Sequence, residues 1–146
     1  QDTMTGGSGP DIYGFAFGQS PITAPDRIIG FEYNTDKVDL FSPNGLGLPA
    51  PLFLSRARKN KSATSLNALA AAVFADCNGS TRGKQALGAN SAALVTATKP
   101  SISGTYLIIN DNDSSLNPTN DLMVNIAGAT GNMPLAGSIP PSRVFI

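Results

Sequence analysis

The 146 residues of this chain include ten basic and ten acidic side chains, so its net charge is zero and no global field would attract nucleic acid or an anionic membrane. Histidine is absent, which excludes the Ser-His-Asp triad, the HExxH zinc motif and histidine general bases. The single cysteine, Cys77, excludes an internal disulfide and a cysteine-based zinc site, and we interpret it as a small core residue or a bystander.

The length fits one domain with a core of its own, and 15 glycines with 11 prolines predict many turns and short strands. No apolar run approaches the roughly 20 residues that are needed to cross a bilayer, so no transmembrane segment is expected. No basic region followed by an apolar one opens the sequence as an N-terminal signal would. An export address, if there is one, is therefore expected elsewhere in the chain.

The first motif is GGSGPDIY at residues 6–13, which matches GGxGxDxUx, the nonapeptide of calcium-binding parallel β-rolls. Glycines permit the positive φ angles of a tight loop that turns its carbonyl oxygens inward, and Asp11 adds a carboxylate. Calcium takes about six to eight such oxygen ligands. The motif predicts a calcium loop, with an ordinary glycine-rich surface turn as the alternative.

Residues 2–5 fit the second half of an earlier copy of this motif, with Asp2 at the aspartate position and Met4 at the large apolar position. Repeat proteins stack several such units to become stable. We therefore expect that Gln1 is not a natural start and that the chain is the C-terminal part of a longer protein.

Period-2 alternation predicts a strand after the motif, in which Tyr13, Phe15 and Phe17 share one face. A turn-rich loop at 18–25 separates it from two further predicted strands. These strands cover residues 26–31 and 37–41, and a proline- and glycine-rich loop follows at 42–51.

A basic run at residues 56–61 has two interpretations, a solvated connector or a contact with anionic polysaccharide or lipid headgroups. The run contains no aromatic residue on which a nucleic acid base would stack. After it, Ser65 is predicted to cap a helix over 65–77, which Asn78 and Gly79 would end. The apolar stripe of this helix consists of Leu66, Leu69, Ala70, Val73 and Phe74.

The second half of the chain is predicted to be β again. Expected strands cover residues 92–98, 105–110 and 122–126, with a possible fourth at 143–146. The second and third flank an Asx-rich connection at 110–121, which indicates a long hairpin.

The acidic residues of this connection, Asp111, Asp113 and Asp121, suggest an EF-hand loop. Its sixth and twelfth positions, however, are Leu116 and Leu122 where glycine and glutamate are required. Asn and Asp commonly turn the backbone through their own hydrogen bonds, and this is our interpretation. A minor calcium site at Asp111 and Asp113 is the alternative.

Paired carboxylates for glycoside hydrolysis can be composed from Asp26, Asp36 and Asp39. They fall in turns and at strand starts beside a calcium-type loop, where capping or metal binding needs no further residues. Tryptophan, which often lines sugar platforms, is absent. We therefore predict no enzymatic activity.

Three segments together resemble the last β-roll turn and cap of RTX proteins, including the C-terminal domain of serralysin-type proteases. They are GGSGPDIYGFAF, APDRIIGF and NTDKVDL, at residues 6–17, 24–31 and 34–40. Gly30 replaces an aspartate of that pattern and Asn34 a glycine. QALG, SAALV, GTYLIIND and NDLMVNI, between residues 85 and 126, resemble the bluetail domain that closes surface proteins of cyanobacteria.

The resemblance implies a single, mainly β domain over residues 1–146. Residues 1–41 would form the terminal turns of a calcium-binding parallel β-roll, and 42–146 a sheet- or sandwich-like cap with one short helix. It also implies a C-terminal, uncleaved signal for a type I exporter, which the apolar ending Val144-Phe145-Ile146 fits. The aspartate usual near that ending is here Ser142 or Arg143.

The expected function is a non-enzymatic, calcium-binding capping module of an extracellular or cell-surface protein that folds when it meets calcium outside the cell. The implied ligands are main-chain oxygens of Gly7 and Gly9 and the carboxylates of Asp11 and Asp26, with Asp2 and Asp36 as weaker candidates. One alternative is a self-assembling surface or filament protein, whose partners would be copies of itself. Another is an adhesin that binds surface polysaccharide.

Overall fold

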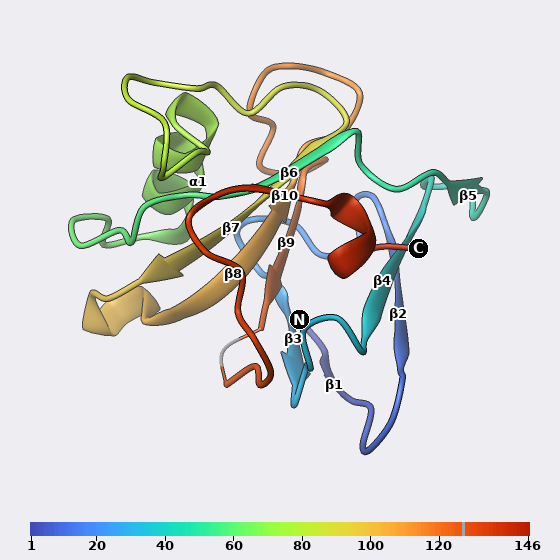
Figure 1. Cartoon of the computed structure of the whole chain (residues 1–146). Coiled ribbons are helices and arrows are strands. Elements are labelled where there is room, and N and C mark those ends of the chain that lie inside the picture. Colours follow the sequence, from blue (N-terminus) through green and yellow to red (C-terminus); the bar gives the residue numbers. More distant parts are fainter. Residues whose placement is uncertain (127) are drawn as a thin grey trace.

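The computed structural model of the chain describes residues 1–126 and 128–146 and is mainly β, with two sheets and one α-helix (Figure 1). The prediction of a mainly β chain with one helix is confirmed. The strands are β1 (Thr3–Thr5), β2 (Ile12–Ala16), β3 (Asp26–Ile29), β4 (Lys37–Phe41), β5 (Gly47–Leu48), β6 (Phe53–Arg56), β7 (Ser91–Ala97), β8 (Gly104–Ile109), β9 (Leu122–Asn125) and β10 (Gly137–Ile139). The helix is α1 (Leu66–Ala75), and 3₁₀ turns cover Pro100–Ile102 and Pro141–Arg143.

The first four strands alternate between the two sheets. In the large sheet, of order β1-β3-β9-β8-β7-β6-β10, β1 pairs in parallel with β3. In the small sheet, of order β2-β4-β5, β2 pairs in parallel with β4. The turns at 6–11 and 30–36 therefore lie at one end of these strands, and the turn at 17–25 lies at the other.

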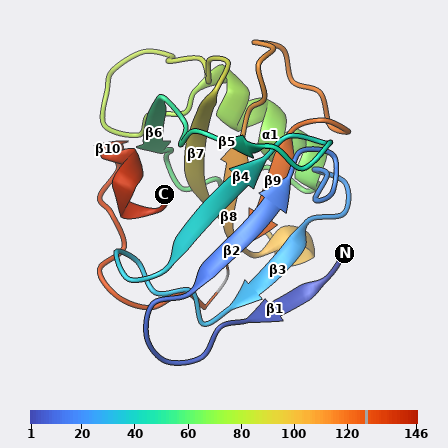
Figure 2. The ribbon, with the colours of Figure 1, turned by 90° about the vertical axis from the view of Figure 1, so that its right-hand side faces the viewer.

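The stack of alternating strands is open on one side and closed on the other. Strands β1 and β2 form the edges of their sheets on the same side of the described chain (Figure 2). On the closed side, β9 pairs in parallel with β3, and β5 pairs in antiparallel fashion with β4. The cap of this stack thus comes from later parts of the chain.

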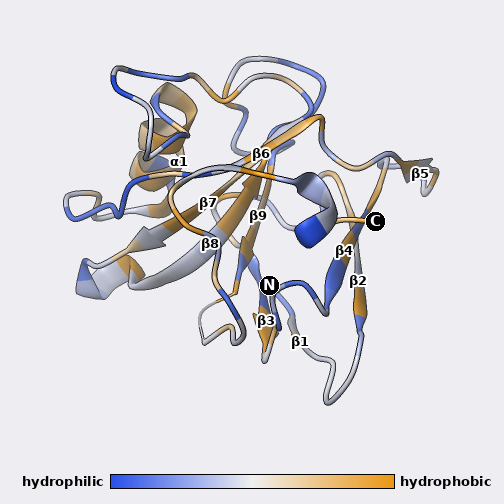
Figure 3. Cartoon of the chain, in the orientation of Figure 1, coloured by the Kyte–Doolittle hydropathy of each residue, from blue (hydrophilic) through white to orange (hydrophobic). Residues whose placement is uncertain are grey.

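Successive side chains of a strand point to opposite faces of a sheet, and in the large sheet the small sheet covers one face and α1 the other. Leu94 of β7 belongs to the core between the two sheets, where Phe15 and Leu40 face it from the small sheet. Val95, one residue later, belongs to a second core under α1, where it meets Val73. Figure 3 shows hydrophobic residues gathered in the central strands and on α1, with hydrophilic residues in the outer loops.

The helix begins as predicted and ends two residues early. The Ser65 hydroxyl accepts a hydrogen bond from the backbone N–H of Ala68 at 3.2 Å, which confirms the predicted N-cap. The C-cap is Asp76, and the predicted ending at Asn78 and Gly79 is wrong. The physical reason is tertiary, because the N–H of Cys77 donates to the carbonyl of Gln85 and draws the chain out of the helix.

The short strands β5, β6 and β10 were not predicted from the sequence. The predicted loop at 42–51 contains β5, and the predicted basic connector begins inside β6. Strand β6 is fixed by parallel pairing with β7 and antiparallel pairing with β10, neither of which is visible locally. Beyond β6 the basic side chains of Arg58, Lys59 and Lys61 are exposed, as a solvated connector requires.

The predicted strand at 143–146 is also wrong. The chain turns through the 3₁₀ segment Pro141–Arg143, and only an isolated bridge joins Phe145 to Val38. The Lys37 ammonium holds this turn, since it donates to the carbonyls of Ser142 and Arg143 at 2.8 and 3.1 Å. Burial, followed by the charge of Arg143, lowers the pKa of Lys37.

Phe145 inserts between the two sheets and is 2% exposed, whereas Ile146 beside it is 52% exposed. The change Phe145→Ala should therefore lower the free energy of unfolding by about 3–5 kcal/mol, because it empties a closed core. Ile146→Ala is the matched control and should shift it by less than about 0.5 kcal/mol. Denaturant unfolding measures both, and equal effects of the two changes would contradict the buried position of Phe145.

Candidate functional site

The turn at 6–11 has the backbone that its glycines predicted. Gly7 and Gly9 adopt φ angles of 121° and 95°, in the region that other residues rarely enter. Gly6 is required for space, because a Cβ there would overlap the carboxylate of Asp11 and the hydroxyl of Tyr13. The turn therefore closes tightly over Asp11.

Asp11 lies beside Asp36 on the adjacent turn at 30–36. Ile12 is in register with Lys37, and the backbone N–H of Asp11 donates to Oδ1 of Asp36 at 3.0 Å. The second oxygen of Asp36 accepts the N–H of Glu32 at 2.8 Å, and the side chain is 2% exposed. Both oxygens of Asp36 are thus used to hold the two turns together.

Asp11 itself has an unsatisfied oxygen. Its Oδ2 is buried and accepts no hydrogen bond, and the hydroxyl of Tyr13 is also buried without a hydrogen bond of good geometry. Burial raises the pKa of Tyr13, the charges of Asp36 and Asp11 raise it further, and the N–H of Gly6 opposes the shift. A buried carboxylate oxygen without a donor is unfavourable, so a hydrogen-bond donor or a cation beside it would stabilise this position.

The main-chain oxygens of the same turn are available to such a cation. Within the described residues, the carbonyls of Gly7 and Gly9 accept no hydrogen bond. No group of three or more His, Cys, Asp or Glu side chains that could hold a metal ion occurs in the part of the chain that the structure describes. A site here would therefore depend on main-chain oxygens with Asp11 as the carboxylate.

Asp26, the other strongly predicted ligand, lies at the opposite end of the strands. It precedes Arg27, which is in register with Thr3, so its neighbour on the adjacent strand is Asp2. Its Oδ1 accepts the N–H of Asp2 at 2.7 Å, and the Ser20 hydroxyl accepts the N–H of Asp26 at 2.8 Å. The structure thus brings Asp11 together with Asp36, and Asp26 together with Asp2, but it does not bring Asp11 and Asp26 to one place.

A third pair of aspartates repeats this geometry in the β8–β9 connection. The N–H of Asp111 donates to Oδ1 of Asp121 at 3.1 Å, and the N–H of Asn117 donates to Oδ2 at 2.6 Å. These bonds match those that Asp36 accepts from Asp11 and from Glu32, four residues before it. The sequence suggested Asp121 only as a member of the rejected EF-hand loop, and its position directly before a strand was the signal for its structural role.

The predicted minor site at Asp111 and Asp113 consists of Asx turns. Oδ1 of Asp111 accepts the N–H of Asp113 at 2.7 Å, and Oδ1 of Asp113 accepts the N–H of Ser115 at 3.0 Å. This is the turn-forming role expected for Asn and Asp in such a connection. These bonds support our interpretation of the loop as a backbone turn.

No family model matches the chain, and searches of curated proteins and of solved structures also found no match. Within the described residues, no helix has the length and apolar character needed to cross a membrane.

Asp121 provides a pH test of this hydrogen-bond pattern. Burial raises its pKa above 3.8, the N–H donors of Asn117 and Asp111 oppose the shift, and the charges of Asp111 and Asp113 add to it. A carboxyl whose pKa is raised by folding stabilises the protein most below its unfolded pKa and loses this contribution as pH rises through its folded pKa. The stability advantage of the wild type over Asp121→Asn should therefore be larger near pH 3.5 than at pH 7.

Unfolding free energies of both proteins across that pH range measure this difference. At pH 7 the variant should still be less stable by about 1–2 kcal/mol, because its amide turns one acceptor oxygen into a donor that faces a backbone N–H. A difference between the two proteins that does not vary with pH would contradict the raised pKa.

Proposed function

We propose that this chain is a calcium-binding end module of a parallel β-roll, which caps a stack of glycine-rich turns in an extracellular or cell-surface protein. The single observation that carries the proposal is the unsatisfied Oδ2 of Asp11 inside a positive-φ glycine turn, stacked on the turn that ends at Asp36. The alternation of β1 to β4 between two sheets supports the β-roll part of the proposal.

The ligands proposed are the main-chain oxygens of Gly7 and Gly9 and the carboxylate of Asp11, with Asp36 as the negative charge of the adjacent turn. Bound calcium would neutralise charge that the fold otherwise buries without a partner. Asp2 and Asp26 would form the equivalent position at the other end of the strands. This splits the ligands expected from the sequence between two half-sites.

The proposed capping role has support in the closed side of the stack. Strand β9 occupies the position next to β3, and Phe145 forms an isolated bridge with Val38 of β4. Two of the three apolar residues of the proposed export signal, Val144 and Phe145, are 0% and 2% exposed. An exporter that recognises them would therefore have to do so before the chain folds, which fits folding that waits for calcium outside the cell.

A calcium titration tests the proposal. With a dissociation constant of about 10⁻⁴–10⁻³ M, 10 mM calcium should stabilise the wild type by about 1.4–2.7 kcal/mol relative to chelator. Asp11→Asn should lose most of this gain, because it removes the negative charge at nearly constant volume. Circular dichroism followed during denaturant unfolding gives the free energies.

The matched control is Asp39→Asn, which removes a half-exposed carboxylate of β4 outside both turns and should keep the calcium response. Magnesium at the same concentration controls for ionic strength. A wild type whose stability is equal in chelator and in calcium, or an Asp11→Asn variant that responds fully, would refute the proposal.

The open edges of β1 and β2 favour a second candidate function, self-assembly into a filament or surface lattice. Unpaired edge strands accept strands of other molecules, and Ile12 at the start of β2 is 65% exposed. As a capping module, the isolated chain should instead be a monomer or dimer in light scattering. An ordered polymer that Ile12→Lys prevents would favour self-assembly over the cap.

A further inference from the structure

A groove lies between the end of the small sheet and the β8–β9 connection, away from the stacked turns at Asp11. It consists of two hollows of about 290 and 520 Å³ that share Phe17, Leu48 and Asn90 among their lining residues. These volumes are in or near the range of small-molecule sites in proteins, roughly 300–1,000 Å³. The groove is therefore large enough for a ligand of one or two rings.

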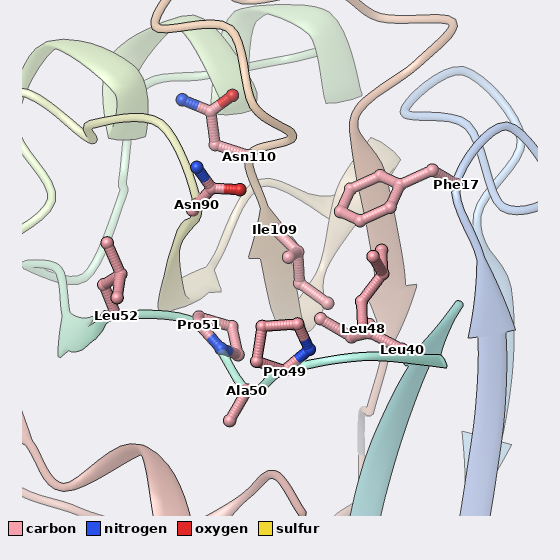
Figure 4. Close-up of a pocket in the computed structure, with 10 residues that line it drawn as sticks. All are labelled: Phe17, Leu40, Leu48, Pro49, Ala50, Pro51, Leu52, Asn90, Ile109 and Asn110. Atoms are coloured by element: carbon pink, nitrogen blue, oxygen red, sulfur yellow. The ribbon is translucent and has the colours of Figure 1, made fainter. Parts of the chain in front are cut away.

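The smaller hollow is mainly apolar. Figure 4 shows the ring of Phe17 pointing from the turn after β2 toward Ile109, with Pro49 and Pro51 along the opposite wall. Phe17 and Leu48 are partly buried against the core, so their exposed surfaces are held in place by packing. A ligand in this hollow would meet one aromatic face and two flat proline rings.

The rim of the larger hollow carries unused hydrogen-bonding groups. Asn90, Asn112 and Asn120 are exposed, and none of their side-chain amides makes a hydrogen bond to the described part of the protein. Asp111 adds a carboxylate of which Oδ1 is used in a turn. Each amide offers both a donor and an acceptor, which suits a ligand with many hydroxyl groups.

The charges of the residues that line the groove limit the kinds of ligand that it can bind. Among the described residues that line the two hollows there is no lysine or arginine, and Asp111 is the only ionisable group. Phosphate, sulfate and uronate groups would therefore be repelled. A neutral pyranose fits, because the apolar face of its ring stacks on an aromatic side chain while its hydroxyls pair with amides.

We propose that this groove binds a neutral sugar unit of a glycan, stacked on Phe17 and hydrogen-bonded by Asn90 and Asn112. The site shares no residue with the proposed calcium ligands, so a test of sugar binding does not depend on whether the chain binds calcium. It also differs from the basic segment at Arg58, Lys59 and Lys61, which would select anionic glycans.

The test uses the full chain on a panel of immobilised neutral mono- and disaccharides of glucose, galactose, mannose and xylose, with anionic glycans as a second set. Calorimetry with the best binder follows. Asn90→Gly removes the amide while glycine accepts the observed φ of 52° freely, so the backbone bonds of residue 90 to Asp111 and Leu52 can remain. Combined with Asn112→Ala, it should weaken binding at least about tenfold, since two hydrogen bonds are lost.

The matched control is Asn67→Ala, which removes an exposed asparagine from α1 and should leave the affinity unchanged. Circular dichroism establishes that each variant is folded. Failure of every neutral sugar to bind saturably, or unchanged affinity in the double variant, would overturn the proposal. Binding confined to anionic glycans and lost in Lys59→Ala with Lys61→Ala would overturn it in favour of the basic segment.

Discussion

One interaction recurs at the start of three strands of this protein, a buried aspartate whose side chain accepts the backbone N–H of another aspartate. Asp26 does this for Asp2, Asp36 for Asp11 and Asp121 for Asp111. A turn that stacks on another turn cannot pair its N–H groups as strands do, so a side chain must accept them. The three carboxylates thus accept backbone N–H groups at the starts of β3, β4 and β9.

The same arrangement leaves a surplus of negative charge at one place. Asp36 has both oxygens occupied by N–H donors, whereas Asp11 keeps one buried oxygen without a donor next to the hydroxyl of Tyr13. A fold that needs its turns close together therefore creates a position that a cation would stabilise. The close approach of Asp11 and Asp36 thus both holds the two turns together and creates the proposed calcium position.

The later part of the chain closes one side of the stack of strands β1 to β4. Strand β9 pairs in parallel with β3 and continues into the hairpin that forms the middle of the large sheet, while α1 covers the opposite face. The groove at Phe17 lies where the small sheet meets the β8–β9 connection. Its apolar floor and uncharged amide rim thus result from the way the cap is joined to the stack.

The sequence by itself determined the mainly β class, the central strands, the Ser65 cap of the helix and the positive-φ turn at Gly7 and Gly9, because alternation, capping and glycine chemistry are local. Only the tertiary structure decided that Asp11 meets Asp36 and not Asp26, since strand direction and register fix which ends coincide. It also decided the short strands β5, β6 and β10 and the fold of the C-terminal residues. Their conformation depends on partners far away in the chain, such as Lys37 for the turn at Arg143.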